Sequence, residues 1–193
     1  MTEYLKGKDA ALMIAGLSLA TFMQVLDSTI ANVALPAIAG HLGASVSQGI
    51  WVVTFFMVFN AASIPLTGFL SKRIGEVRLF LISVTLFIVA SLLCGLSTNL
   101  VMLIIARVFQ GLVSGPMIPL AQSLLLRNTP LERRSMAMGL FGIVIMIAPV
   151  LGPILGGYIS DNYYWGWIFF INVPIGLLSV SYTHLRAHET RGN

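Results

Sequence analysis

The sequence predicts an all-α membrane protein with six transmembrane helices. Of its 193 residues, 57% are hydrophobic and 9% are charged, and the mean hydropathy is +0.91. Soluble domains are about a quarter charged, so this composition indicates a bilayer. It excludes a disordered chain, a nucleic-acid-binding domain and a disulfide-stapled secreted module. Because a spanning helix takes about 20 residues, a chain of this length holds about six passes.

Charged and polar residues divide the apolar sequence into six segments. The first ends before Pro36, the second at the basic run 71–73 and the third at the polar run 97–99. Each segment is near bilayer length and lacks both the polar face of a surface helix and the alternation of a barrel strand. A short segment, 1–9, precedes them, and together they predict one six-helix bundle over residues 10–180. The expected spans are residues 10–35, 49–70, 79–96, 100–126, 135–159 and 165–180.

The distribution of positive charge predicts the orientation of the bundle. Three connections, residues 36–48, 96–99 and 160–164, contain no Lys or Arg. The N-terminus and the other two connections together hold Lys6, Lys8, Lys72, Arg73, Arg78, Arg127, Arg133 and Arg134. Positive residues concentrate on the cytoplasmic side of membrane proteins, so the N-terminus is predicted to be cytoplasmic. The aromatic residues within 163–167 would then lie at the outer interface.

The C-terminal residues 181–193 differ from the rest of the chain. Apolar sequence stops at Val180, which leaves the sixth helix only about fifteen residues after Trp165, short of a comfortable span. The segment carries His184 and His188, two of the three histidines, so a metal-binding or regulatory tail is one interpretation. We favour the other, a truncated sixth helix followed by non-native residues, and expect neither a helix nor a function there.

Two ionisable residues lie inside the predicted spans, where each costs on the order of 3 kcal/mol on insertion scales. Asp27 belongs to the first span, with Gln24, Ser28 and Asn32 on or near the same helix face. Arg107 is the eighth residue of the fourth span and lies at a similar depth. The two are therefore expected to pair or to face one aqueous cavity, as parts of a proton- or substrate-coupled network. The alternatives are a static packing bridge, or an Asp27 close enough to the interface to stay solvated.

Glycine and proline mark the fifth span. Pro149 and Pro153 allow this helix to bend, while Gly152, Gly156 and Gly157 allow another helix to approach closely. Helices that rock against each other have this composition, and so do helices in static tight packing.

The connection between the second and third spans predicts a tight turn whose simplest role is topology. It contains Gly68, Ser71, Lys72, Arg73, Gly75 and Arg78. The pattern Gly68-x-x-Ser71 at the end of the second span recurs as Gly157-x-x-Ser160 at the end of the fifth span, on the opposite side of the membrane. This recurrence indicates two three-helix repeats of inverted topology.

Several chemical signatures are missing from the sequence. There is no His-Glu-x-x-His motif, no cysteine pair and no glycine-rich phosphate loop that ends in Lys-Ser or Lys-Thr. No nucleophile–base set is visible either, so we expect neither an enzyme nor a bound metal or cofactor. Any energy source would then be an ion gradient.

Five motifs resemble, in order, the fourteen-helix drug/proton antiporter branch of the major facilitator superfamily. They are residues 26–36, 68–78, 107–115, 149–157 and 165–176, so the resemblance covers about residues 10–180. Within the branch, the chain is most similar to the inner-membrane subunits of tripartite multidrug exporters. A fourteen-helix protein needs more than twice this length, so the resemblance implies the N-terminal six-helix bundle alone.

The resemblance implies efflux of varied lipophilic compounds across the bacterial inner membrane in exchange for protons. It also implies a periplasmic adaptor and an outer-membrane channel as partners. Arg107 and Asp27 would couple transport to protons, and residues 149–157 would form the antiporter motif. The substrate cavity would include Gln24, Asp27, Asn32 and Gln110. Two alternatives stay open: an importer of a small solute with the same fold, and a membrane module that only packs against a partner.

Overall fold

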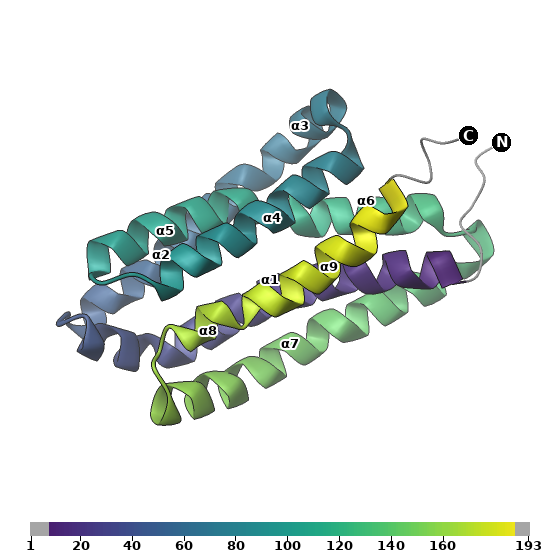
Figure 1. The fold of residues 1–193 in the computed structure, drawn as a ribbon. Helices are drawn as coiled ribbons and strands as arrows, with labels where there is room; N and C mark the ends of the chain where they lie inside the picture. Colours follow the sequence, from purple (N-terminus) through teal and green to yellow (C-terminus); the bar gives the residue numbers. More distant parts are fainter. Residues whose placement is uncertain (1–7, 188–193) are drawn as a thin grey trace.

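In the computed structural model, which describes residues 8–187, every regular element is a helix (Figure 1). The elements are α1 (Lys8–His41), α2 (Val46–Ser63), the 3₁₀ turn η1 (Ile64–Leu66), α3 (Thr67–Ile74), α4 (Glu76–Gly95), α5 (Leu100–Ser114), α6 (Met117–Asn128), the 3₁₀ turn η2 (Leu131–Arg133), α7 (Arg134–Asn162), α8 (Trp167–Phe170) and α9 (Asn172–Ala187).

Among the described residues, five helical segments are long and apolar enough to cross a membrane, and a shorter apolar helix follows them. The five are Ala11–His41, Val46–Ile74, Glu76–Gly95, Leu100–Asn128 and Leu131–Asn162, and the sixth is Trp167–Thr183. These segments match the six predicted spans in order. The prediction of an all-α multi-pass membrane fold is therefore confirmed.

Prolines explain why several of these segments consist of two helices. A proline has no backbone N–H and cannot donate to the carbonyl four residues earlier. Pro65 lies in the η1 turn that separates α2 from α3, and Pro116 lies between α5 and α6. Pro174 cannot donate to Phe170, where α8 ends, so the chain turns at Ile171 before α9 begins.

Two helix ends differ from the prediction. α1 continues through Pro36 to His41, because Ile38 and Ala39 beyond the proline are fully buried and keep the helix packed. α9 continues past Val180 to Ala187, so the expectation that no helix forms there was wrong. No Pro or Gly occurs between residues 181 and 187 to stop a helix. Residues 1–7 and 188–193 lie outside the described part, with His188 among them, and the non-native origin of 181–193 stays a prediction.

The connections gather at two ends of the bundle. The start of α1, the α3–α4 turn and the α6–α7 connection lie at one end (Figure 1), so the basic loops share an end with the start of α1. At the opposite end, Tyr163 and Trp167 are exposed, as expected of interface aromatics. Trp165 is different: it is 1% exposed, and its ring packs edge-on against Phe169.

Candidate functional site

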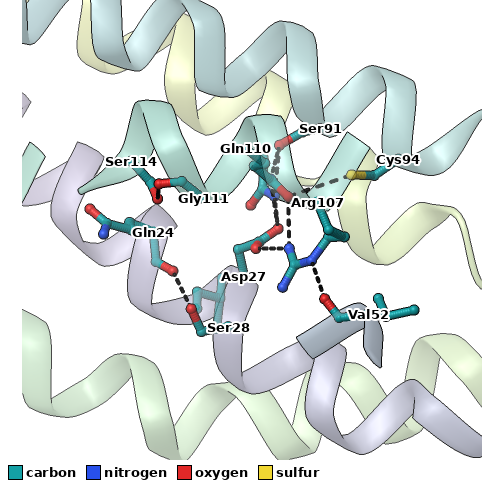
Figure 2. A network of polar contacts seen from close by, with 12 residues as sticks. Gln24, Asp27, Ser28, Val52, Ser91, Cys94, Arg107, Gln110, Gly111 and Ser114 are labelled. Atoms are coloured by element: carbon teal, nitrogen blue, oxygen red, sulfur yellow. Dashed lines mark hydrogen bonds and ion pairs between the residues drawn. The ribbon is translucent and has the colours of Figure 1, made fainter. Parts of the chain in front are cut away.

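Asp27 and Arg107 meet inside the bundle. Asp27 projects from α1 and Arg107 from α5, and Arg107 Nη1 donates to Asp27 Oδ2 at 2.5 Å (Figure 2). The two side chains are 1% and 0% exposed, so Asp27 is not solvated in this structure. Of the two arrangements expected from the sequence, a pair or a shared aqueous cavity, the structure has the pair.

The remaining contacts of Arg107 orient its guanidinium. Nε donates to the carbonyl of Val52 on α2 at 3.3 Å, and Nη1 also donates to Oε1 of Gln110 at 2.7 Å. The guanidinium carbon lies 4.0 Å from the ring centre of Phe56 and 5.4 Å from that of Phe169. A cation over an aromatic face is stabilised by the quadrupole of the ring, most strongly where water is absent.

Two amide side chains hold the other oxygen of Asp27. Asn172 Nδ2 donates to Oδ1 at 2.6 Å, and Gln110 Nε2 donates to it at 3.3 Å. Both amides also donate to the hydroxyl of Ser91 on α4, at 3.2 and 2.8 Å respectively. The side chains of this buried network thus come from α1, α4, α5 and α9. Because both Asp27 oxygens accept from N–H donors, the donor set suits an ionised carboxylate.

This arrangement makes the protonation state of Asp27 consequential. Removing one charge of a buried pair leaves the other uncompensated in a medium of low dielectric, which costs several kcal/mol. If Asp27 bound a proton, the charge of Arg107 would be left uncompensated in this way. The O–H group of Asp27 would also face the N–H groups of two amides. A proton gained or lost at Asp27 would therefore change the interactions that link these four helices.

The other residues predicted for the substrate cavity divide into two groups. Gln110 belongs to the buried network, and Gln24 is buried one turn of α1 before Asp27. Asn32 is exposed and donates to the carbonyl of Ser28 at 2.9 Å, so it lies outside the network. The polar residues of α1 thus extend from the buried interior to an exposed face.

The predicted antiporter motif forms the contact between α7 and α1. A Cβ on Gly152 would lie 2.6 Å from Cβ of Thr29, and one on Gly156 would lie 3.1 Å from the carbonyl oxygen of Ile30. Gly152 therefore needs to be glycine for the helices to approach this closely, whereas a Cβ on Gly156 would require a shift of a few tenths of an ångström. Gly157 has open space around it, and Pro149 and Pro153 are exposed on α7.

The predicted loop motif forms the end of α3 and its turn into α4. Gly75 has φ of 90°, a conformation that favours glycine, and it reverses the chain between the two helices. The Ser71 hydroxyl donates to the carbonyl of Gly68 at 3.1 Å. The exposed basic residues of the motif are Lys72, Arg73 and Arg78.

Asn172 and Ser91 belong to the network but were not predicted as site residues from the sequence. Both are uncharged and carry no insertion penalty large enough to single them out. Serine is also common at helix contacts in membranes. The available signal was the position of Asn172, a lone amide two residues before a proline in an apolar span.

Comparisons with known proteins agree with this fold. A family model described as the Major Facilitator Superfamily matches residues 17–193. The chain is 62% identical over 189 residues to the multidrug export protein EmrB of Escherichia coli (strain K12), covering 97% of this chain and 37% of that protein. It is 55% identical over 188 residues to the fatty acid resistance protein FarB of Neisseria gonorrhoeae, covering 96% and 37%. The chain thus spans little more than a third of these relatives.

A solved structure has a similar fold. It is a bacterial homologue of the human lysosomal transporter Spinster, in an inward-facing and unoccupied conformation. The TM-score is 0.74 at 18% sequence identity, and the match covers 94% of this chain and 43% of that chain. At this identity the likeness concerns the fold alone.

Proposed function

The chain belongs to the Major Facilitator Superfamily, and from this premise we propose that it forms the N-terminal six-helix part of a proton-coupled exporter of lipophilic compounds. Members of this superfamily are transporters rather than enzymes. The names of two relatives, a multidrug export protein and a fatty acid resistance protein, support varied lipophilic molecules as the substrate class. No enzymatic step is assigned to the chain.

The observation that carries the proposal is the buried pair of Asp27 and Arg107. A charge inside a span is costly and is rarely retained without a function. In the proposed mechanism, an ionised Asp27 holds α1 against α4, α5 and α9, as in this structure. Protonation neutralises the carboxylate, weakens its attraction to Arg107 and allows the helices to separate. The membrane potential would contribute about 2.3 kcal/mol per proton per 100 mV, in addition to the pH gradient.

We assign the substrate cavity to the polar residues that extend along α1 toward the exposed surface, together with Gln110. Gln24, Asp27 and Asn32 supply carboxylate and amide groups in otherwise apolar surroundings. This suits lipophilic compounds that carry a polar or cationic group. The close contact of Gly152 and Gly156 with α1 would let α7 move against α1 as the cavity changes.

The proposed location is the bacterial inner membrane, with the N-terminus in the cytoplasm. Support comes from the two basic connections, α3–α4 and α6–α7, which share one end of the bundle with the start of α1. The opposite end would face the periplasm. There we propose a periplasmic adaptor and an outer-membrane channel as partners, by analogy with tripartite exporters.

A chimeric transporter tests the proposed coupling. Residues 1–180 of this chain would replace the matching part of the E. coli relative, and the product would be reconstituted in proteoliposomes. Adding a lipophilic substrate should produce proton counterflow, measured with a pH-sensitive dye. Arg107→Ala should abolish the counterflow, because Asp27 then loses the partner that makes its protonation consequential.

The matched control is Arg127→Ala. Arg127 is near the end of α6, is 69% exposed and pairs with Glu76 at 3.0 Å, so it lies outside the network. This variant should keep its proton counterflow. Normal coupling in Arg107→Ala would refute the proposed role of Arg107. Substrate movement without any proton counterflow would refute proton-coupled export, and no movement at all would favour a non-transporting module.

A further inference from the structure

Two members of the network have a buried polar atom without a hydrogen-bond partner: Arg107, through its Nη2, and Asn172. Its Nδ2 donates to both Asp27 Oδ1 and Ser91, while its Oδ1 is buried and has no hydrogen-bond partner. A buried carbonyl oxygen without a partner is uncommon, since most buried polar atoms are paired. Asn172 is itself fully buried, at 0% exposure, so this oxygen also has no access to bulk water.

The second amide of the network is fixed by its contacts. Gln110 Oε1 accepts from Arg107 Nη1 at 2.7 Å and from the thiol of Cys94 at 3.5 Å. If the Gln110 amide turned over, its NH₂ group would face the guanidinium, and donor would oppose donor. Its Nε2 must therefore keep pointing at Asp27 and Ser91. Asn172 has no such restraint on its oxygen.

From these contacts we infer that Asn172 is a positioning residue whose amide turns over when Asp27 takes up a proton. With an ionised Asp27, Nδ2 donates to the carboxylate, as in this structure. With a protonated Asp27, the O–H needs an acceptor, and the turned amide supplies Oδ1 at the same place. The Ser91 hydroxyl, which now accepts from Nδ2, would rotate and donate to the same oxygen.

This inference deepens the proposed function and rests on it, because it concerns the residue proposed to bind the coupling proton. It lets Asn172 keep its hydrogen bond to Asp27 in both protonation states, as the donor to the carboxylate and as the acceptor from the protonated acid. Without Asn172, both the carboxylate and the protonated acid would lose their hydrogen bond to α9. The charged form would lose more, because hydrogen bonds to ionised groups are about twice as strong as neutral ones.

Few other charged or titratable groups face Asp27 from the helices around it. Arg107 approaches from α5, and the Cys94 thiol on α4 is joined to the network through Gln110. α2 and α8 contain no titratable residue. In α6, α7 and α9, the charged or titratable residues whose side chains are described lie toward the helix ends. They are Arg127, Arg134, Tyr158, Asp161 and Tyr182.

Infrared spectroscopy on the 193-residue chain in lipid nanodiscs tests the inference without any transport step. The C=O stretching band of protonated Asp27 would be identified as the band that is lost in Asp27→Asn. In Asn172→Leu this band should move to higher wavenumber, because the O–H no longer donates to an amide oxygen. Asn172→Ala, whose smaller side chain avoids any clash, should give the same displacement.

The matched control is Ser179→Ala. Ser179 lies two turns further along α9, is fully buried and donates to the carbonyl of Gly16 on α1 at 2.8 Å. The substitution Ser179→Ala therefore removes a contact between α9 and α1 without changing any contact of Asp27. The band should stay in place in this variant. An equal displacement of the band in Ser179→Ala would show that Asn172 acts only through helix packing, and it would overturn the inference.

The pH profile of the chimeric transporter gives a second readout. In Asn172→Leu, the pH at which proton counterflow is half-maximal should rise by about one unit, from the loss of one hydrogen bond to a charged group. An unchanged infrared band and an unchanged profile would overturn the inference even if transport is proton-coupled. A displaced band in a transporter that moves substrate without protons would retain the role of Asn172 and refute the proposed function.

Discussion

Neutralising one member of the buried pair is expected to destabilise the bundle more than removing both. In Asp27→Asn, Arg107 stays charged at 0% exposure, because a guanidinium does not lose its proton in proteins. Breaking a buried pair in this way costs about 3–5 kcal/mol. We expect the lower value, about 3 kcal/mol, because Gln110 and the Val52 carbonyl still accept from Arg107 and the Phe56 ring still lies against it.

The double variant Asp27→Asn with Arg107→Met removes the unpaired charge and keeps most of the buried volume. Replacing both members of a buried pair is often neutral or stabilising. The double variant should therefore be at least about 2 kcal/mol more stable than Asp27→Asn alone. The single variant Arg107→Met should behave differently with pH. Its unpaired carboxylate can bind a proton and become neutral, so its loss of stability should shrink as the pH is lowered, whereas that of Asp27→Asn should not.

The assay is denaturant unfolding in detergent micelles, followed by tryptophan fluorescence. Trp165 is buried in the folded bundle and provides the signal. The pair of Glu76 and Arg127 serves as the matched control, since Arg127 is 69% exposed and Glu76 is 24% exposed. Glu76→Gln should change the free energy of unfolding by less than about 1 kcal/mol, because an ion pair whose arginine is mostly in solvent contributes little. A double variant that is less stable than either single variant would refute the reasoning.

Three further substitutions test the contact between α1 and α7 and the turn between α3 and α4. Gly152→Ala should destabilise the bundle by about 1–3 kcal/mol, because its Cβ would meet the side chain of Thr29, whereas Gly157→Ala should change stability by less than about 0.5 kcal/mol. Gly75→Ala should cost about 1–3 kcal/mol, because its φ of 90° is unfavourable for a residue with a Cβ. Both costs are measurable by the same unfolding assay, and equal stability of the Gly152 and Gly157 variants would contradict the assigned α1–α7 contact.

The number, order and approximate bounds of the spans were predictable because the bilayer imposes one simple requirement. Each span must be apolar over about 20 residues, and charged loops mark the ends. Helix breaks inside a span were harder to predict. Pro36 lies within a continuous helix, whereas Pro116 separates two helices. A proline removes one hydrogen bond in either case, and packing against neighbours decides whether the helix continues.

The site was predictable only where it is charged. Asp27 and Arg107 were conspicuous because an ionisable group in a span needs a compensating partner. Two opposite charges at a similar depth therefore indicate an ion pair. Asn172 and Ser91 carry no such cost and gave no comparable signal. Asn32 was grouped with Asp27 because they share one polar stripe, but at 100° per residue the five positions between them amount to about 140° around the helix. That rotation takes Asn32 out of the buried interior.

The network also helps to determine how the helices pack. In a bilayer the hydrophobic effect drives helices together only weakly, because lipid chains are as apolar as the side chains. Directional hydrogen bonds can therefore contribute to the register of α1 against α4, α5 and α9, and in this structure they converge on the Asp27 carboxylate. A proton on that carboxylate changes the interactions that hold this register. Coupling between protonation and helix packing would then follow from the position of Asp27, without a separate element to transmit the change.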